Sequence, residues 1–206
     1  MTEPGTATAL IDAAEARFAA EGIDGTSLRA VMRDAGTDPG AVHYHFGGRA
    51  KLAAAVLDRV LVPLNDRRLE LLDRCAERGA PTVEELTDAL VRPDVEAAGA
   101  LERRGAGRGR LIGRIYLDPA EFVTSQVEER FRPVAQRFFP HLLAAVPDVG
   151  PDLVAWRIRW CLFGTLGALW ADPDEPLRHD PEELVGRLVT TIAAALAAPT
   201  RPEEAT

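Results

Sequence analysis

The sequence predicts an all-α protein, and three observations support this fold class. Apolar residues recur at helical spacing, glycines and prolines stand where such segments begin or end, and no segment alternates apolar and polar residues between hairpin turns. Leu10, Ala14 and Phe18 repeat every four residues and predict a first helix. Gly22 follows this helix and can adopt the left-handed conformation that ends it.

Two short helices joined by a tight turn are expected next. The first covers 27–35, and its apolar residues at i, i+3, i+4 and i+7 are Leu28, Val31, Met32 and Ala35. Gly36 follows at once and ends this helix. Asp38 offers an N-cap to a second helix over 39–45, and Pro39 takes its first position, where the missing N–H costs nothing.

A long fourth helix is expected over 49–75, with Pro63 as a place where it can kink. Residues 82–85 (TVEE) form a capping box for a fifth helix, which Pro93 should end or bend. Glycine and arginine gather over 98–109, so we expect a mobile connection there.

Four further segments complete the helical pattern. Residues 111–117 are short and apolar, and Pro119 is expected to start the next helix, which Pro140 closes. A long helix over 151–171 follows, and a last one over 181–198 is capped by the acidic residues at its start.

The composition is that of an ordinary globular protein. The chain has 206 residues, of which 47% are hydrophobic and 27% charged. No run of apolar residues is long enough for a membrane span, and the N-terminal segment lacks the pattern of a secretion signal. Cys75 and Cys161 lie far apart without a CxxC motif, which favours reduced thiols in a cytoplasmic protein.

The charge distribution argues against a protein that coats nucleic acid non-specifically. The net charge is −8, and residues 1–60 hold six Lys or Arg against eight Asp or Glu, a balance of −2. Between residues 26 and 51, however, four basic residues face two acidic ones, a balance of +2. Because a few placed groups suffice for phosphate contacts, this segment predicts specific and salt-sensitive DNA binding.

The arrangement of helix, glycine turn and short helix is the one that lays a recognition helix in the major groove of DNA. Val42 and Phe46 share one face of the short helix and would anchor it, which leaves its other side chains for DNA. His43 and His45 form an H-x-H pair, but on a helix they point about 200° apart. We therefore expect no metal site, and no cofactor motif is found.

Residues 26–46 (TSLRAVMRDAGTDPGAVHYHF) resemble the helix-turn-helix of the TetR family of bacterial transcription regulators. The matching residues are Thr26, Ser27, Leu28, Arg29, Val31, Ala35, Gly36, Gly40, Val42, Tyr44, His45, Phe46 and Arg49. The upstream stretch ALIDAAEARFAAEGIDGTS is similar to the family's first helix, so the resemblance covers about 6–60. It implies a three-helix DNA-binding domain that the fourth helix links to a helical ligand-binding and dimerisation domain.

We accordingly expect a DNA-binding domain over 1–48, a ligand-binding and dimerisation domain over 49–198, and a disordered tail over 199–206. The residues predicted to contact DNA are Ser27, Arg29, Pro39, Gly40, Ala41, His43, Tyr44, His45, Arg49 and Lys51. Arg49 and Lys51 should hold the phosphate backbone, and Ala41 can place its methyl against a thymine methyl.

The segment over 152–170 is apolar nearly all round, so it must be buried on more than one side. A monomer cannot easily cover it, and two glycines would let another helix approach, so we expect a homodimer interface there. Its predicted residues are Trp156, Trp160, Phe163, Gly164 and Gly167.

The middle region should hold an effector site between helices. Its predicted residues are Arg110, Arg114, Tyr116, Phe122, Phe131 and Phe138. Arg110 and Arg114 could bind an anionic head group or simply pair with Glu121 or Glu128, and any one aromatic could be ordinary core. The segment AVHYHFGGRAKLAAAV is similar to a TetR subgroup that includes repressors sensing acyl chains.

The sequence thus predicts a homodimeric, ligand-responsive regulator, a repressor that binds a near-palindromic operator and is released by a small apolar or acidic effector. The alternative is a DNA-binding regulator controlled by a partner protein. An enzyme is not expected, because G-x-S-x-G, HExxH, phosphate-loop and carboxylate-pair motifs are absent from the sequence.

Overall fold

The structure, a computed structural model, describes residues 4–102, 108–117, 121–171 and 180–200, and its regular structure within these ranges is helical. The helices are α1 (Pro4–Glu21), α2 (Leu28–Asp34), α3 (Ala41–Phe46), α4 (Arg49–Glu77), α5 (Val83–Glu102), α6 (Arg108–Leu117), α7 (Glu121–Ala145), α8 (Pro151–Ala171) and α9 (Pro181–Ala197). The predicted fold class is confirmed.

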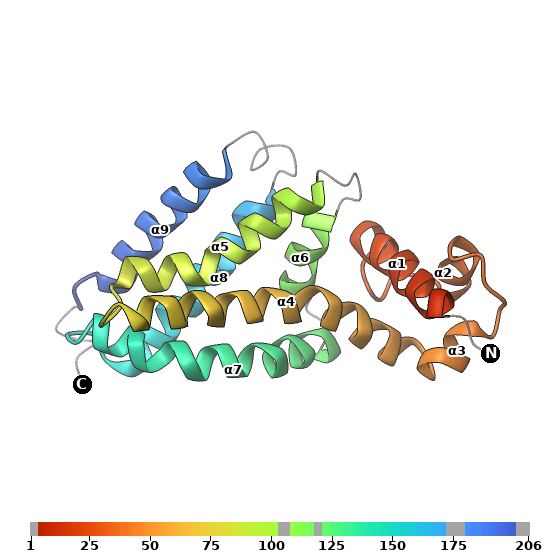
Figure 1. The fold of residues 1–206 in the computed structure, drawn as a ribbon, viewed down its shortest axis with the longest axis horizontal. Coiled ribbons are helices and arrows are strands. Elements are labelled where there is room, and N and C mark those ends of the chain that lie inside the picture. The colour runs from red at the N-terminus through yellow and green to blue at the C-terminus, as the bar shows by residue number, and fades with distance from the viewer. Residues whose placement is uncertain (1–3, 103–107, 118–120, 172–179, 201–206) are drawn as a thin grey trace.

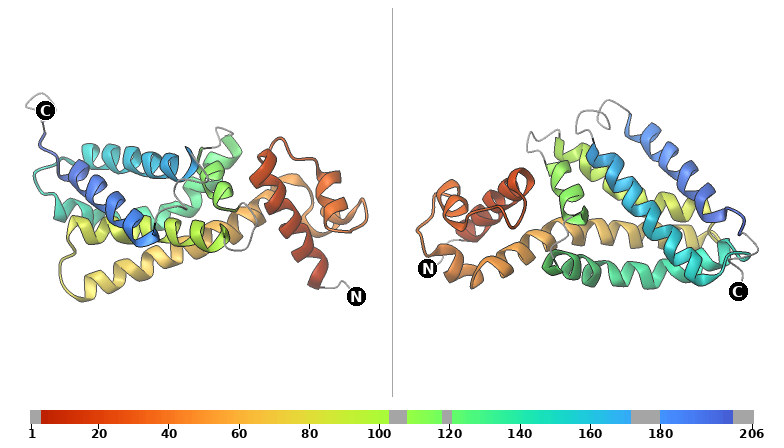
Figure 2. Two further views of the ribbon diagram at one scale, coloured as in Figure 1. Left: turned by 90° about the horizontal axis from the view of Figure 1, so that it is seen from above. Right: turned by 180° about the vertical axis from the view of Figure 1, so that it is seen from behind.

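Helices α1 to α3 gather at one end of an elongated molecule, as Figure 1 shows. Helix α4 leaves this end and runs along most of the length, with α5 and α7 packed on it. Helix α9 packs on α5 and α8, away from the end that holds α1 to α3 (Figure 2). Helix α6 lies between the two parts because it contacts both α1 and α8.

Most helix ends lie where the sequence predicts them. Gly22 and Gly36 end α1 and α2 with φ of 80° and 65°. In the capping box the Thr82 N–H donates to Glu85 Oε2 at 3.0 Å, and the Glu85 N–H donates to Thr82 Oγ1 at 3.2 Å. The Thr82 N–H, aided by Arg78, lowers the pKa of the Glu85 carboxyl below its ordinary value. Asp180 caps α9 through the Glu182 N–H.

The start of the third helix differs from the prediction. Helix α3 begins at Ala41 rather than Pro39, its N-cap is Gly40, and no side chain caps it. The reason is that the backbone carbonyl of Asp38, not its carboxylate, accepts the Ala41 N–H at 3.0 Å. Pro39 and Gly40 therefore belong to the turn before the helix.

Prolines end fewer helices than predicted. Helix α7 passes through Pro140 to Ala145, so the predicted end at Pro140 is wrong. Helix α5 continues through Pro93 to Glu102, so of the two predicted effects of Pro93, an end or a bend, the end does not occur. Pro93 lies beside buried Asp94 and Val95, and such packing outweighs the roughly 3 kcal/mol cost of a helical proline. The connection predicted over 98–109 is shorter than expected, because α5 extends to Glu102 and α6 begins at Arg108. Residues 103–107, Pro119 and the tail from 201 lie outside the described ranges.

Two apolar clusters form the core. The first joins α1 to α4 with α6 and the start of α7; its largest fully buried side chains are Leu10, Phe18, Leu52, Leu57, Leu61, Leu111 and Ile115. The second lies farther along α4 and α7 and includes α5, α8 and α9; it contains Leu72, Leu86, Leu90, Val134, Phe138, Val154 and Leu196. The first cluster thus binds the end domain and α6 into one packed unit.

A buried polar group lies between the two clusters. The Arg68 guanidinium donates from Nε to the Leu90 carbonyl at 3.0 Å, from Nη1 to Asn65 Oδ1 at 2.7 Å, and from Nη2 to Asp94 Oδ2. The amide of Asn65 donates to the Arg130 carbonyl at 2.9 Å. Burial raises the pKa of the Asp94 carboxyl above its ordinary value, against the opposing effect of Arg68. This group, here called the polar layer (Asn65, Arg68, Asp94 and the Arg130 carbonyl), ties α4 to α5 and α7.

Arg68→Met is expected to lower the free energy of unfolding by about 3–5 kcal/mol, because it leaves the Asp94 carboxylate buried without its cation. The double variant Arg68→Met, Asp94→Leu should recover part of that loss, because an apolar pair needs no desolvated charge. Arg67→Met, at a partly exposed neighbour, is the matched control and should cost much less. Urea unfolding followed by circular dichroism measures all three, and a double variant no more stable than Arg68→Met contradicts the interpretation.

Candidate functional site

Helix α3 presents exposed side chains at the end of the molecule. Val42 is fully buried and Phe46 half-buried, so one face anchors the helix. His43 is exposed, and Tyr44 is 75% exposed although it is large and partly apolar. His45 is half-buried, and its ring meets that of Tyr44 edge-on at 5.1 Å between centroids. Val42 and Phe46 therefore form the anchoring face, as predicted, and the side chains of His43 and Tyr44 face solvent.

Two glycines set the exit from α3. Gly47 and Gly48 have φ of 72° and 133°, a region that side-chain-bearing residues rarely adopt. A Cβ on Gly48 would come within 3.9 Å of the His43 imidazole. The sharp turn brings α4 in directly after α3, so that Arg49 begins a new helix three residues after Phe46.

Arg49 has a structural contact that the sequence does not reveal. Its Nη1 donates to the carbonyls of Ile23 and Thr26, at 3.0 and 2.6 Å. It thereby ties the start of α4 to the segment between α1 and α2. The sequence offers no local signal for this contact, because the residues it joins are more than twenty positions apart. Its predicted phosphate contact stays a prediction, as does that of exposed Lys51.

The charges of α2 are partly neutralised within the domain. Arg17 of α1 bonds Asp34 at 2.6 Å, and this guanidinium lowers the pKa of the Asp34 carboxyl. Arg33 contacts the same carboxylate at 3.4 Å but remains largely exposed. Because Asp34 is paired, the exposed cations Arg29 and Lys51 face less opposing charge than the sequence alone indicates.

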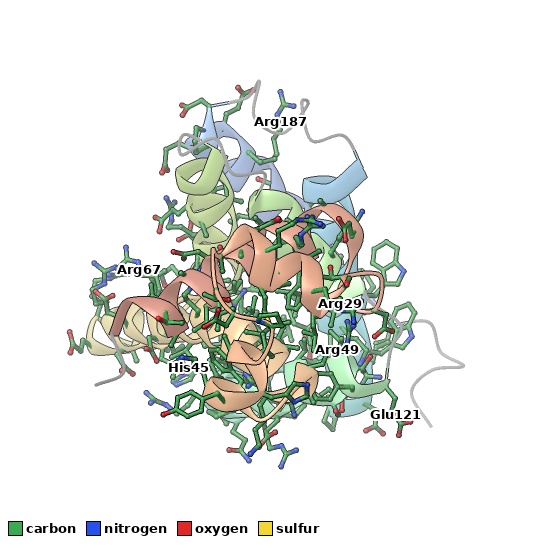
Figure 3. All side chains as sticks on the ribbon, turned by 90° about the vertical axis from the view of Figure 1, so that its right-hand side faces the viewer. Arg29, His45, Arg49, Arg67, Glu121 and Arg187 are labelled. Carbon is green, nitrogen blue, oxygen red and sulfur yellow. The ribbon has the colours of Figure 1, made fainter. Side chains whose placement is uncertain are left out.

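The remaining predicted DNA contacts lie on the same end. Ser27, Pro39 and Gly40 are exposed, and Ala41 is half-buried. Figure 3 views the molecule from this end and labels Arg29, His45 and Arg49, which come from α2, α3 and α4 respectively. The described structure brings the predicted set together on one end domain, and their contact with DNA stays a prediction.

Helix α6 connects this end domain to the rest of the protein. Its Leu111, Ile112 and Ile115 are buried in the first apolar cluster, together with residues of α1 and α4. Arg114 lies at the same junction, since a Cβ on Gly22 would be 3.5 Å from its Nη1. Helix α6 is therefore in contact with α1 near the end of that helix. The side chains of Arg110 and Tyr116 lie outside what the structure describes.

The predicted effector aromatics separate into two environments. Phe138 is buried in the second apolar cluster, and half-buried Phe131 packs against it. The Arg68 guanidinium lies 5.6 Å from the centroid of the Phe131 ring. Phe122, by contrast, is 37% exposed at the start of α7. Phe131 and Phe138 therefore share one apolar region, whereas Phe122 does not belong to it.

Helix α8 has one face packed and one face open within the chain. Val154, Arg157 and Cys161 are buried, and Arg157 donates to the carbonyls of Leu196 and Ala198 at the end of α9. Trp156 and Trp160, one helical turn apart, are 61% and 63% exposed. Gly164, a further turn on, is exposed, with nothing within 4 Å of a Cβ built on it. Phe163 and the surroundings of Gly167 lie outside the described side chains.

None of the described helices is long and apolar enough to span a membrane.

Comparison with family models gives two matches. Residues 10–56 match the model described as "Bacterial regulatory proteins, tetR family", and residues 88–195 match "Tetracyclin repressor-like, C-terminal domain". Together they cover the end domain and most of the remaining helices. No curated protein matches the chain.

Solved structures of similar fold are transcriptional regulators. The fatty acid degradation regulator FadR from Bacillus halodurans is 13% identical with a TM-score of 0.68, over 94% of this chain and 96% of that one. FadR from Bacillus subtilis, solved with stearoyl-CoA, has the same identity and TM-score over 94% and 99%. NalD, a repressor of a multidrug efflux pump in Pseudomonas aeruginosa, is 22% identical with a TM-score of 0.62, over 92% and 94%.

These neighbours share the fold at low sequence identity, whereas the C-terminal family model alone matches more than half of the chain. Such proteins are DNA-binding regulators and not enzymes, in agreement with the sequence prediction. The chain belongs to the TetR family of bacterial transcriptional regulators.

Proposed function

We propose that this regulator is a homodimeric repressor that binds a near-palindromic operator and leaves it when a small effector binds the helical domain. The observation that carries the proposal is the exposure of His43 and Tyr44 on a helix whose opposite face is buried. Such an arrangement lets α3 enter the major groove without unpacking the domain. Bacterial DNA lies in the cytoplasm, which would be its place of action.

The open face of α8 supports the dimer. Trp156 and Trp160 expose more than half of their surface in the single chain, and adjacent large apolar side chains of this kind mark interaction surfaces. The open space at Gly164 continues this face by one turn and would allow a partner helix to approach. In a two-fold dimer each α3 helix would read one half-site of the operator. The two half-sites would lie about 34 Å apart, which is one turn of DNA.

The junction of α1, α4 and α6 supports a route for effector control. Leu111 and Ile115 of α6 share an apolar cluster with the proposed DNA-binding helices, so the two parts are in direct packing contact. An effector that prefers one arrangement of α6 and α4 would shift the separation of the two recognition helices. DNA would then be released by a shift of population toward the wrong spacing.

An elongated apolar molecule with an acidic or polar head is the proposed effector. Phe131 and Phe138 share an apolar region that could receive the chain, and Arg114 lies at the junction where a head group could be held. The stearoyl-CoA complex of the Bacillus subtilis regulator shows that a protein of this fold takes a long acyl chain. Control by a partner protein is the alternative, and it predicts no response to small molecules.

Tyr44→Ala and His43→Ala should each weaken operator binding by about 1–3 kcal/mol, because each removes an exposed contact of α3 without disturbing Val42. Mobility shift with a selected operator measures the loss. Arg33→Ala, a largely exposed cation of α2, is the matched control and should have little effect. Arg49→Glu is a poorer probe, since it also breaks the ties to Ile23 and Thr26. Unchanged binding by both α3 variants would exclude α3 as the reading helix.

The wild-type protein should sediment as a dimer at micromolar concentration, and Gly164→Arg should sediment as a monomer with unchanged helical circular dichroism. The reason is that a Cβ at Gly164 has no described neighbour within 4 Å, so a side chain can leave the helix there, whereas one as long as arginine would block a partner helix. Gly150→Arg, at an equally open glycine before α8, should remain dimeric. A monomeric wild type refutes the proposed interface.

Fatty acids, acyl thioesters or aromatic acids should raise the melting temperature and release the operator, because they bind the folded state. Thermal-shift screening followed by mobility shift measures both effects. If only cationic compounds stabilise the protein and release DNA, the proposed effector class is wrong.

A further inference from the structure

The polar layer interrupts the apolar core at one level across three helices. On α4 it separates Leu64 of the first cluster from Leu71 of the second. On α5 Asp94 stands between Val91 and Ala97, which pack in the second and first clusters respectively. On α7 the Arg130 carbonyl lies between Val127 of the first cluster and Val134 of the second. The polar layer therefore crosses the interior of the helical domain.

One atom of this layer lacks a hydrogen-bond partner. Asp94 is 2% exposed, and its Oδ2 accepts from Arg68, but its Oδ1 is buried without any donor. Buried polar atoms are nearly always paired, and an unpaired acceptor carries a free-energy cost. An orphaned carboxylate oxygen in the interior of a ligand-binding domain thus requires an explanation.

The hydrogen bonds that the described neighbours donate run to acceptors other than Oδ1. Arg68 directs Nε to Leu90 and Nη1 to Asn65, and its Nη2 donates to the other oxygen of Asp94. The amide nitrogen of Asn65 donates to the Arg130 carbonyl. Among the described residues no donor reaches Oδ1, so a water or a ligand is left to supply one.

We propose that the polar layer is part of the effector site, and that an uncharged hydroxyl or amide N–H of the effector donates to Oδ1 of Asp94. This inference rests on the proposed control by a small effector. The apolar clusters on both sides suit a ligand that is mainly hydrocarbon. A carboxylate would be repelled by Asp94. A cation would be repelled by Arg68, which already neutralises the charge of Asp94. The group that reaches Oδ1 is therefore neutral.

A donor at this position would act directly on α4. Asn65 and Arg68 belong to α4, whereas their partners belong to α5 and α7. A hydrogen bond from the effector draws charge density from the Asp94 carboxylate and so changes its hold on Arg68. Because α4 also carries the first cluster with the DNA-binding helices, a change at the polar layer reaches the operator-binding end.

The test compares probes of one chain length that differ in their head. Dodecanamide and dodecanol carry a donor, methyl dodecanoate is neutral without one, and dodecanoate is anionic. For the full-length wild type, titration calorimetry should give dodecanamide and dodecanol dissociation constants at least about tenfold lower than that of methyl dodecanoate. Hydrogen exchange should show protection of the segments around Arg68 and Asp94 when dodecanamide binds.

The double variant Arg68→Met, Asp94→Leu locates the preference. It should still bind the apolar chain, but the advantage of dodecanamide over methyl dodecanoate should fall below about twofold. The control variant Arg67→Met, Glu70→Leu also replaces an arginine and its carboxylate partner by apolar residues. Its arginine is the neighbour of Arg68 on the outer side of α4, where Arg67 projects outward (Figure 3). This control should keep the full preference for dodecanamide. If the first variant does not fold, the wild-type affinities and the exchange protection decide alone.

The inference is overturned if wild type binds methyl dodecanoate as tightly as dodecanamide, if none of the four probes binds, or if the preference survives in the folded Arg68→Met, Asp94→Leu variant. In these cases Oδ1 is satisfied by water only. Dodecanoate reports separately on the head-group site proposed near Arg114, since its affinity should not depend on Asp94. If the wild type does not bind an operator even when no probe is present, that result counts against the proposed function. The preference for probes that carry a donor can still be measured in that case.

Discussion

Helix α4 is packed against α1 and α3 at its beginning and against α5 and α7 farther along, so a single helix belongs to both apolar clusters. It continues through Pro63, which lies at an exposed position, without ending. Under the proposed function, the stiffness of a helix of this length would carry a change at its far end to α3, which precedes it. The rest of the architecture depends on this shared helix.

The first apolar cluster extends past residue 48, the position at which the sequence analysis divides the domains. The division expected at residue 48 follows the start of α4, but Leu52, Leu57 and Leu61 pack with the DNA-binding helices and with α6. The end domain therefore includes the first half of α4 as a packed unit. The polar layer is the first interruption of apolar packing along that helix.

Electrostatic pairing explains how a chain of net charge −8 can present a DNA-binding surface. Glu15 is buried beside Arg59, and Asp34 is held by Arg17, so acidic residues of the end domain are engaged with cations inside it. The exposed residues of α2, α3 and the start of α4 then face solvent with a local excess of basic groups. Such local placement, rather than the total charge, governs contact with phosphates.

Local patterns in the sequence determined the fold class, the helix-turn-helix and most helix ends, because helical periodicity, glycine conformation and capping boxes act within a few residues. Gly22, Gly36 and the pair Thr82–Glu85 behave as those patterns predict. The tertiary structure alone decided where prolines are tolerated, because the burial around Pro93 is a long-range effect. It also decided the ties of Arg49 and the pairing of Arg68 with Asp94, since these join residues distant in the chain that share no local signal.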